Sequence, residues 1–468
     1  MTLIKSISGI RGTIGGKPGD SLSPLDVVKF AAAYGTWILR TSPANATIVI
    51  GRDARLSGGI VSNLVASTLQ SVGLDVIDLG LSTTPTVEMA VTEFEAAGGI
   101  ILTASHNPIQ WNALKLLNNK GEFISSQDGQ DILVIAENDD YNFVDVRKLG
   151  NYTQNHDFLQ IHIQKILDLP LVNVEAIKDA DFSICVDAVN STGGIAVPLL
   201  LEALGVAKEN IKLINCEPTG HFAHNPEPLP ENLHEISSLL EKGKFDLGIV
   251  VDPDVDRLVL ICENGAPFGE EYTLVAVSDY ILKHTVGNTV SNLSSTAALR
   301  DVTVAHGGKY FAAAVGEVNV VEAMKANDAI IGGEGNGGII YPELHYGRDA
   351  LAGIALFLSH LASSNKSMTA LRASYPNYHI SKNKIELTPE INVDEILAKI
   401  EKKYAQYPVN TIDGVRIDFD KEWIHLRKSN TEPIIRIYSE SETQSTAASL
   451  ANKIISDIKE IISATAES

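Results

Sequence analysis

Short apolar runs recur along the chain, and each ends in a polar turn that leads into a helical pattern. Three of these runs are residues 47–51, 182–187 and 288–293. After each helical pattern the chain returns to an apolar segment, at residues 73–77 in the first copy. In the second and third copies the return segments are expected at 204–206 and 301–304. Repeated strand–turn–helix–strand units predict doubly wound α/β domains with mostly parallel sheets.

The last hundred residues show a different pattern. Strand signals at 414–419, 423–427 and 434–438 alternate with turns, and an amphipathic helix is expected at 442–464. This combination predicts a smaller α+β domain with an antiparallel sheet. The sequence therefore predicts three α/β domains followed by one α+β domain. The expected boundaries are 1–153, 154–256, 257–371 and 372–468.

Composition narrows the class of protein. A chain of 468 residues with 44% apolar and 20% charged residues is typical of a multidomain globular protein. Its longest apolar runs, such as 247–251, are too short to cross a bilayer, and residues 1–6 lack the apolar stretch of a signal peptide. Cys185, Cys216 and Cys262 are widely spaced and odd in number, which predicts free thiols in a reducing cytoplasm.

The net charge of −21 argues against general binding of nucleic acid or anionic membranes. A phosphate ester would also be repelled by this global field. A site for such a substrate therefore needs its own local cations. Arg11, Arg52 and Lys115 stand beside glycine or turn residues and are candidates for that role.

The first candidate for chemistry is Ser105. It lies in Thr-Ala-Ser-His-Asn-Pro, residues 103–108, directly after the apolar run 98–102. Its hydroxyl is thus placed on a turn at a strand end, where ligand sites of open α/β sheets gather. An ordinary turn or helix cap explains the same residue types equally well. Ser105 is therefore a candidate nucleophile or phosphate carrier whose role depends on the rest of the chain.

A second candidate is an acidic loop. Asp252, Asp254 and Asp256 alternate between two apolar runs, residues 245–251 and 258–262. Period-two spacing in an extended loop places the three carboxylates on one side. Carboxylates so close together repel one another, and a hard cation such as Mg²⁺ or Ca²⁺ relieves the repulsion. An EF-hand loop shares the spacing, but an arginine fills its glycine position and the flanks are typical of strands.

Two further loops carry candidate ligands. The glycine-rich segment 332–338 contains Glu334 and Asn336, whose carboxylate and amide suit sugar hydroxyls. The segment 427–433 combines cations, hydroxyls and an amide on a turn before a strand, as in a phosphate cradle. Its candidate ligands are Arg427, Ser429, Asn430 and Thr431.

These four segments, in this order, resemble the α-D-phosphohexomutase superfamily, which includes phosphoglucomutase, phosphomannomutase and phosphoglucosamine mutase. The resemblance covers essentially the whole chain and implies four domains around a central cleft. It also implies an isomerase that interconverts hexose 6-phosphates and hexose 1-phosphates. The phosphate would pass through a phosphoserine and a hexose 1,6-bisphosphate, with Mg²⁺ as the metal.

The resemblance assigns roles near the first two segments. Ser105 corresponds to the phosphorylated serine, which binds Mg²⁺ through its phosphate together with the three aspartates. Lys115 corresponds to the general acid/base, which requires a pKa depressed by burial or by nearby arginines. His106 stands beside the nucleophile, and Arg257 beside the metal loop meets phosphate.

The resemblance also assigns the substrate-binding groups. Glu334 and Asn336 correspond to sugar ligands. The 427–433 loop, with Arg427, Ser429, Asn430 and Thr431, corresponds to the loop that holds the non-reacting phosphate, and Arg11 to an amino-terminal Gly-Ile-Arg-Gly element. The expected partner is a small sugar phosphate, bound by a monomer or homodimer.

Departures from the family pattern bear on the sugar. Position 253 is Pro and position 113 is Ala where Gly is common. The sugar loop reads Glu-Gly-Asn-Gly where many members have Glu-x-Ser-Gly, a form that resembles archaeal-type phosphoglucosamine mutases and phosphoglucomutases. We therefore expect a phosphoglucosamine mutase, with phosphoglucomutase/phosphomannomutase as the alternative.

Two other classes of function were compared with this one. A serine hydrolase centred on Ser105 and His106 is disfavoured, because adjacent side chains point apart in an extended segment and no Gly-x-Ser-x-Gly elbow exists. A non-catalytic sugar-phosphate binding protein is disfavoured because nucleophile and metal ligands are both present. A phosphate on Ser105 would exclude the hydrolase, and bisphosphate-dependent turnover would exclude the binding protein.

Overall fold

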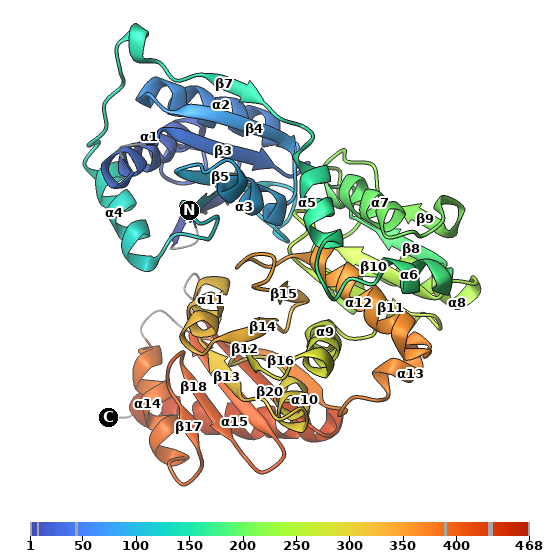
Figure 1. The fold of residues 1–468 in the computed structure, drawn as a ribbon. Helices are drawn as coiled ribbons and strands as arrows, with labels where there is room; N and C mark the ends of the chain where they lie inside the picture. The colour runs from blue at the N-terminus through green and yellow to red at the C-terminus, as the bar shows by residue number, and fades with distance from the viewer. Residues whose placement is uncertain (1, 7–8, 43–44, 388–390, 429–433, 467–468) are drawn as a thin grey trace. The chain divides into compact units, whose positions relative to one another are not determined.

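The computed structural model describes residues 2–6, 9–42, 45–387, 391–428 and 434–466, and it divides into two compact units (Figure 1). The first unit consists of residues 1–281 and 336–372, and the second of residues 282–335 and 373–468. The Ser105 turn and the acidic loop both belong to the first unit. The glycine-rich loop is divided between the units after Gly335, and the Arg427 loop belongs to the second.

The first unit begins with a seven-stranded sheet in the order β1-β2-β6-β5-β3-β4-β7. Its strands are β1 (Ile4–Ser6), β2 (Gly9–Thr13), β3 (Thr47–Arg52), β4 (Asp75–Leu81), β5 (Gly98–Leu102), β6 (Trp111–Leu117) and β7 (Tyr152–Gln154). The pairs from β5 through β3 and β4 to β7 are parallel, whereas those from β1 through β2 and β6 to β5 are antiparallel. The sheet is thus mixed, less parallel than expected, because a short turn joins β5 directly to β6 without a crossover helix. That turn carries Ser105.

Helices cover both faces of this sheet. They are α1 (Pro24–Thr41), α2 (Gly58–Val72), α3 (Thr84–Glu93), α4 (Ser126–Glu137) and α5 (Phe158–Leu167). Ile48 and Ile50 pack in a core with α1, α2 and α4, whereas Val49 packs in a second core with α3 and Phe158 of α5. Successive strand residues therefore point into different cores, which explains why β3 is an unbroken apolar run.

The second sheet of this unit has the order β11-β10-β8-β9. Its strands are β8 (Ile184–Asp187), β9 (Ile211–Ile214), β10 (Leu247–Val251) and β11 (Leu258–Cys262), and its helices are α6 (Val174–Ala180), α7 (Gly193–Ala203) and α8 (His234–Lys242). The β9-β8-β10 pairs are parallel, and β11 is antiparallel to β10 because only the acidic loop joins them. The return segment expected at 204–206 is wrong, since these residues form the turn after α7 and the strand is β9.

The rest of the first unit contains α9 (Glu270–His284), which runs past its boundary, and β15 (Gly338–Ile340), α12 (Ala350–Ser364) and α13 (Met368–Arg372). Three short 3₁₀ helices also belong to this unit, at Val146–Lys148, Lys208–Asn210 and Pro230–Asn232.

The second unit contains a parallel arrangement in the order β13-β12-β14, formed by β12 (Asn288–Asn292), β13 (Tyr310–Ala313) and β14 (Ala329–Glu334). Its helices are α10 (Ala298–Ala305) and α11 (Glu317–Ala326). The return strand expected at 301–304 is wrong, because these residues lie in α10. Leu299, Val302 and Thr303 are buried, and this helical spacing identifies one face of α10 rather than a strand.

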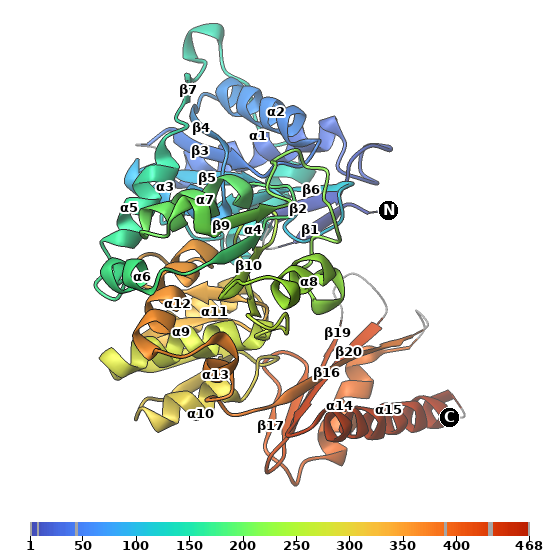
Figure 2. The ribbon, with the colours of Figure 1, turned by 90° about the vertical axis from the view of Figure 1, so that its right-hand side faces the viewer.

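The carboxyl-terminal part of this unit is a five-stranded antiparallel sheet in the order β16-β20-β19-β18-β17. Its strands are β16 (His379–Glu386), β17 (Val409–Asn410), β18 (Val415–Asp418), β19 (Trp423–Lys428) and β20 (Ile434–Ser441). Helices α14 (Val393–Lys403) and α15 (Gln444–Ala466) share one apolar core with the sheet and lie beside it in Figure 2. This confirms the expected α+β part.

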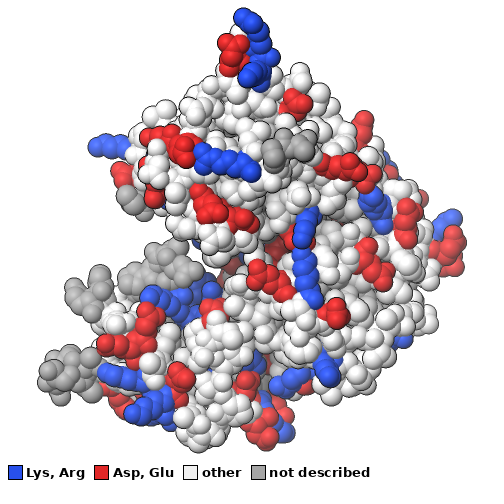
Figure 3. Space-filling view, turned by 60° about the vertical axis from the view of Figure 1, so that its left-hand side comes forward, with Lys and Arg blue, Asp and Glu red and all other residues white. Residues whose placement is uncertain are grey.

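The cysteines are free, as the sequence predicts, and the surface carries charges of both signs. Acidic and basic side chains are interspersed on the face drawn in Figure 3. Cys185, Cys216 and Cys262 are free thiols. Within the described ranges, no helix has the length and apolar character needed to span a membrane.

Candidate active site

The Ser105 side chain is held on a tight turn between β5 and β6. Its backbone has a φ of +47°, a left-handed conformation that few residues other than glycine adopt. The Ser105 backbone N–H donates to Thr103 Oγ1 at 2.9 Å, and its hydroxyl donates to Asp252 Oδ2 at 2.9 Å. The residue is only 7% exposed. The turn between β5 and β6 therefore points the Ser105 hydroxyl at the acidic loop between β10 and β11 of the second sheet.

His106 lies closer to this hydroxyl than expected. Ser105 Oγ and His106 Nδ1 are 3.3 Å apart, so the expectation that the two side chains point apart is wrong. The left-handed turn at Ser105 replaces the extended backbone that the expectation assumed. Burial and the charges of Arg257 and Arg348 hold the pKa of His106 well below its usual value, so the imidazole is neutral. Its Nε2 lies 4.0 Å from Glu227 Oε1, too far for the orienting hydrogen bond of a serine hydrolase triad.

The acidic loop brings three buried carboxylates together after β10. Ligand oxygens of Asp252, Asp254 and Asp256 all lie within 4.8 Å of one another, and none of the three residues is exposed. Asp252 Oδ1 accepts the backbone N–H groups of Asp256 and Arg257, each at 3.2 Å. These bonds curl the loop back on Asp252, and this gathers the carboxylates that alternate along the sequence.

Two cations and one hydroxyl offset part of this buried charge. Asp254 Oδ2 accepts from Thr84 Oγ1 at 2.6 Å and from Lys115 Nζ at 2.8 Å. Asp256 Oδ2 lies 2.6 Å from Arg348 Nη2 and 3.6 Å from Lys115 Nζ. Thr84 and Arg348 are not predicted from the sequence, because neither belongs to a recognisable motif. They reach the loop from the start of α3 and from the residue before the N-cap of α12.

The remaining carboxylate oxygens fit a bound cation. Among the described residues, no hydrogen bond reaches the buried Oδ1 atoms of Asp254 and Asp256. Burial and the two neighbouring aspartates raise the pKa of Asp252 well above its usual value. Buried oxygens without donors and a carboxyl that resists ionisation both mark a shortage of positive charge. An all-oxygen donor set of this kind suits Mg²⁺.

Lys115 departs from the expectation of a depressed pKa. Burial lowers the pKa of its ammonium, but Asp254 and Asp256 outweigh burial and raise it above the usual value. Lys115 is therefore protonated at neutral pH. Arg348 lowers the pKa of Lys115, as nearby arginines were expected to do, but its effect is smaller.

A divalent cation is expected to stabilise the protein more strongly as the pH rises. At low pH Asp252 keeps its proton, and that proton competes with the cation. Affinity therefore increases as the pH passes upward through the raised pKa of Asp252. The shift in melting temperature caused by a fixed Mg²⁺ concentration measures this from mildly acidic to mildly alkaline solution. Asp252→Asn, which cannot ionise, should give a smaller shift that barely changes with pH. A wild-type shift that is largest in acid would contradict the expectation.

Arg257 and Arg11, two further cations predicted to meet the substrate, also belong to the first unit. Arg257 follows the acidic loop, and its charge lowers the pKa of Asp252. Arg11 in β2 pairs with Ala113 in β6, two residues before Lys115. Because directly paired residues and alternate residues share a face, Arg11 and Lys115 lie on the same face of the sheet.

In the second unit, two of the predicted substrate ligands, Glu334 and Arg427, are linked to neighbouring backbone N–H groups. Glu334 Oε1 accepts Asn292 Nδ2 at 2.9 Å and the backbone N–H of Gly316 at 3.1 Å. Arg427 Nε lies 2.8 Å from Asp413 Oδ2, which also accepts the backbone N–H of residue 315 at 2.9 Å. Glu334 thus bonds directly to the N–H of Gly316, whereas Arg427 is linked to the N–H of the preceding residue through Asp413.

The other predicted substrate ligands are placed differently. Asn336 belongs to the first unit, where its Oδ1 accepts the backbone N–H of Gly338 at 3.2 Å. Ser429, Asn430 and Thr431 lie outside the described residues.

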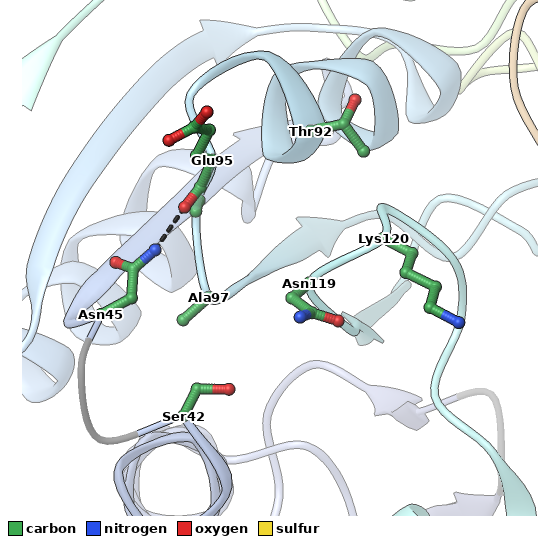
Figure 4. Close-up of a pocket in the computed structure, with 8 residues that line it drawn as sticks. Ser42, Asn45, Thr92, Glu95, Ala97, Asn119 and Lys120 are labelled. Atoms are coloured by element: carbon green, nitrogen blue, oxygen red, sulfur yellow. Dashed lines mark hydrogen bonds between the residues drawn. The ribbon is translucent and has the colours of Figure 1, made fainter.

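A hollow of about 410 Å³ lies elsewhere on the first unit, near the amino-terminal end of β5 (Figure 4). Its lining residues are Ser42, Asn45, Thr92, Glu95, Ala96, Ala97, Asn119 and Lys120. Asn45 Nδ2 bonds to the backbone oxygen of Glu95 across it. None of these lining residues belongs to the candidate site described above.

Comparison with known families matches four consecutive parts of the chain, described as phosphoglucomutase/phosphomannomutase α/β/α domains I, II and III and the C-terminal domain. The matched residues are 3–143, 160–265, 269–378 and 385–456. The chain belongs to the phosphoglucomutase/phosphomannomutase family. It is therefore a phosphohexomutase, an enzyme of the isomerase class, with the four-domain α/β architecture of that family.

Two relatives show how far the similarity extends. A phosphoglucomutase/phosphomannomutase from Thermococcus kodakarensis is 34% identical over 442 residues, covering 93% of this chain and 95% of the relative. A phosphoglucosamine/phosphogalactosamine mutase from Sulfurisphaera tokodaii is 31% identical over 460 residues, covering 97% and 98%. The names of these relatives differ in the sugar, so the family alone leaves the substrate open.

Solved structures share the fold at lower identity. A phosphoglucomutase/phosphomannomutase family protein from Burkholderia thailandensis superposes with a TM-score of 0.83 at 23% identity, covering 98% of this chain and 97% of the other. The N-acetylphosphoglucosamine mutase of Aspergillus fumigatus, in complex with GlcNAc-6P and magnesium, has a TM-score of 0.60 at 14% identity, covering 98% and 96%. A complex of that mutase with glucose 1,6-bisphosphate has a TM-score of 0.52 at 14% identity, covering 92% and 99%.

Proposed function

We propose that this phosphohexomutase interconverts glucosamine 6-phosphate and glucosamine 1-phosphate through a phosphoserine at Ser105, with Mg²⁺ as its metal. The observation that supports the proposal most directly is the contact of Ser105 Oγ with Asp252 at 2.9 Å. It joins the hydroxyl on the β5–β6 turn to a buried carboxylate cluster that also contacts Lys115. The unpaired cysteines support a cytoplasmic location.

The distance between the two ends of a hexose explains the need for a phosphoserine. O1 and O6 are too far apart for one in-line transfer. In the first step the bond between Ser105 Oγ and phosphorus breaks while a bond forms from phosphorus to the free sugar hydroxyl. Lys115 takes the proton of that hydroxyl, and the product is a hexose 1,6-bisphosphate. After the bisphosphate turns end over end, Ser105 Oγ, left as an oxyanion by the first transfer, attacks the other phosphate, and Lys115 gives its proton to the departing sugar oxygen. The net reaction is an isomerisation.

The residues divide the remaining work. Asp252, Asp254 and Asp256, together with a phosphate on Ser105, would hold Mg²⁺, which would neutralise charge on the transferring phosphoryl group. Arg257 meets the phosphate and neutral His106 stands beside the nucleophile. Lys115 becomes a better base as the negative field of Asp254 and Asp256 is neutralised.

The substrate is held away from the reacting atoms by other groups. Glu334 and Asn336 bind sugar hydroxyls, and Arg427 with residues 429–431 holds the phosphate that does not react. Arg11 adds positive charge from β2. Since either phosphate must fit the same cradle after the intermediate turns, charge rather than sugar-specific contacts dominates there. These local cations offset the repulsion of a phosphate ester by a chain of net charge −21.

The choice of glucosamine rests on the sugar loop and on one relative. The Glu-Gly-Asn-Gly sequence around Glu334 resembles archaeal-type members, and the S. tokodaii relative is named a phosphoglucosamine/phosphogalactosamine mutase. The alternative is a phosphoglucomutase/phosphomannomutase, the name of the T. kodakarensis relative.

Coupled assays of glucosamine 1-phosphate, glucose 1-phosphate and mannose 1-phosphate test the proposal. We expect kcat/KM to be at least about tenfold higher for glucosamine 1-phosphate, which corresponds to about 1.4 kcal/mol of transition-state stabilisation. Intact mass should show one phosphate per chain after incubation with a hexose 1,6-bisphosphate, located on Ser105 by peptide mapping. A preference for glucose or mannose 1-phosphate would select the alternative sugar. Turnover without any phosphorylated chain would refute the phosphoserine route.

A further inference from the structure

One buried arginine forms hydrogen bonds to the backbone of the turn that carries Ser105. Arg55 follows β3 and is 1% exposed. Its Nη1 donates to the backbone oxygens of Pro108 and Trp111 at 2.8 and 3.0 Å. Its Nη2 donates to the backbone oxygen of Asn107 at 2.7 Å and to that of Ser105. A single guanidinium thus donates hydrogen bonds to four backbone carbonyl groups of the segment between β5 and the start of β6.

Asp53 closes a ring of hydrogen bonds around the same turn. Its carboxylate accepts Arg55 Nε at 3.0 Å and the Arg55 backbone N–H at 2.9 Å. It also accepts Thr103 Oγ1 at 2.6 Å, and Thr103 Oγ1 in turn accepts the Ser105 backbone N–H at 2.9 Å. Asp53 and Arg55 therefore hold Ser105 through both its N–H and its carbonyl oxygen.

These hydrogen bonds stabilise the backbone conformation of Ser105, the proposed nucleophile. Ser105 has a left-handed backbone, which costs energy for a residue with a Cβ and persists only where the surroundings enforce it. The surroundings that contact its backbone are Thr103 and Arg55. The left-handed turn also aims Ser105 Oγ at Asp252. The direction of the hydroxyl therefore depends on hydrogen bonds made to the backbone, away from the reacting atoms.

The same segment also touches the acidic loop. The backbone N–H of Ala54, between Asp53 and Arg55, donates to Ser191 Oγ at 3.3 Å. Ser191 Oγ donates to the backbone oxygen of Pro253 at 2.7 Å, and Thr192 Oγ1 donates to the same atom at 2.8 Å. Residues 53–55 are thus one hydrogen bond from the Ser105 turn and two from the loop of Asp252.

We propose that Arg55 is a positioning residue for phosphoryl transfer, which sets Ser105 Oγ relative to the acidic loop without touching substrate. The proposal rests on the role of Ser105 proposed above. A guanidinium presents five donors in a rigid fork, whereas a lysine ammonium presents three donors on one atom. A lysine at position 55 would keep the positive charge beside Asp53. Its single nitrogen could not donate to all four carbonyl groups that the two Nη atoms of Arg55 contact. The geometry assigns the effect to the fork rather than to the charge.

Arg55→Lys tests this inference in the full-length enzyme. We expect kcat to fall about 100-fold, because a misplacement of about 1 Å costs that much in reactions that depend on orientation. KM for the sugar phosphate should change less than about twofold, since the proposed substrate ligands lie on other loops. Phosphorylation of Ser105 by a hexose 1,6-bisphosphate, followed by intact mass in a single turnover, should slow by the same factor as kcat.

A matched control separates positioning from stability. Tyr34 is fully buried in the same part of the first unit, and its hydroxyl donates to the backbone oxygens of Gly99 and Leu117 at 3.2 and 2.7 Å. Tyr34→Phe removes bonds to two carbonyl groups of the β5–β6 sheet without touching the Ser105 turn. It should lower the melting temperature and leave kcat within about twofold of wild type.

Chemical rescue gives a second measurement. Arg55→Ala leaves a buried space shaped for a guanidinium, so millimolar guanidinium chloride should raise its kcat in a saturable way, while Tyr34→Phe should not respond. Wild-type kcat in Arg55→Lys would overturn the inference, as would an equal loss of kcat in Tyr34→Phe. If Arg55→Ala does not fold, Arg55→Lys alone decides. A wild-type enzyme that takes no phosphate onto Ser105 would instead refute the proposed function.

Discussion

Replacing Ser105 with alanine is expected to reduce turnover by at least about four orders of magnitude, because the phosphate then has no carrier between the two ends of the sugar. The folded protein should change little. The substitution removes the hydrogen bond to Asp252 and the 3.3 Å contact with His106 Nδ1, a loss of about 1–2 kcal/mol, and it leaves the hydrogen bonds of Thr103 and Arg55 to the backbone in place. The measurement is kcat with each hexose 1-phosphate, using enzyme from a host without its own mutase. Intact mass should show no phosphate on the variant.

Ser82→Ala provides the matched control. Ser82 is a buried serine directly after β4 in the same sheet, and its hydroxyl makes a contact of 3.5 Å with the backbone oxygen of Thr83. It should retain both turnover and the phosphate mark. Activity of Ser105→Ala within about tenfold of wild type would remove Ser105 from the mechanism, because loss of a true nucleophile costs far more. Full phosphorylation of Ser105→Ala would assign the phosphate to another residue.

The sequence predicts the elements of the fold better than their connections. The apolar runs at 47–51, 98–102 and 182–187 are strands because each is buried on both faces. The return segments were misplaced at 204–206 and 301–304, because a short run such as Val302–Val304 reads the same in a strand and on a helix face. Whether neighbouring strands run parallel or antiparallel depends on how much chain joins them. The tight turns after β5 and β10 decide this, and both turns carry residues of the proposed site.

Sequence motifs predict the loops of the candidate site, whereas the residues that support those loops follow only from the fold. Ser105 and the three aspartates stand in spaced patterns that a single sequence can show. Thr84, Arg348 and Arg55 stand in no such pattern, and each reaches the site only once its helix or strand is placed. The proximity of His106 to Ser105 was also missed, because it depends on a left-handed residue that local sequence did not indicate.

In the proposed mechanism, charge compensation within the acidic loop links metal binding to catalysis. Lys115 and Arg348 balance part of the charge on Asp254 and Asp256. A divalent cation bound by the same carboxylates competes with Lys115 for them. Binding of the cation and release of Lys115 to accept a proton are therefore two consequences of one electrostatic exchange.

Lys115→Met is accordingly expected to separate stability, metal affinity and turnover. Without metal, Asp254 and Asp256 lose a buried partner, which should lower the free energy of unfolding by about 3–5 kcal/mol. Mg²⁺ should bind more tightly to the variant than to wild type, because the competing ammonium is gone. Saturating Mg²⁺ should restore most of the lost stability, yet kcat should remain about 100- to 10,000-fold below wild type, since no group takes the hydroxyl proton.

Denaturant unfolding with and without Mg²⁺, calorimetric titration of Mg²⁺, and kcat at saturating metal measure the three quantities. Lys120→Met is the control, because Lys120 is exposed on the turn just after β6 and should match wild type in all three. Weaker Mg²⁺ binding by Lys115→Met would show that the lysine supports the metal rather than competing with it. A wild-type kcat in Lys115→Met would show that a group other than Lys115 accepts the hydroxyl proton. Tighter metal binding together with lost turnover is the combination expected of a general base that competes with the metal.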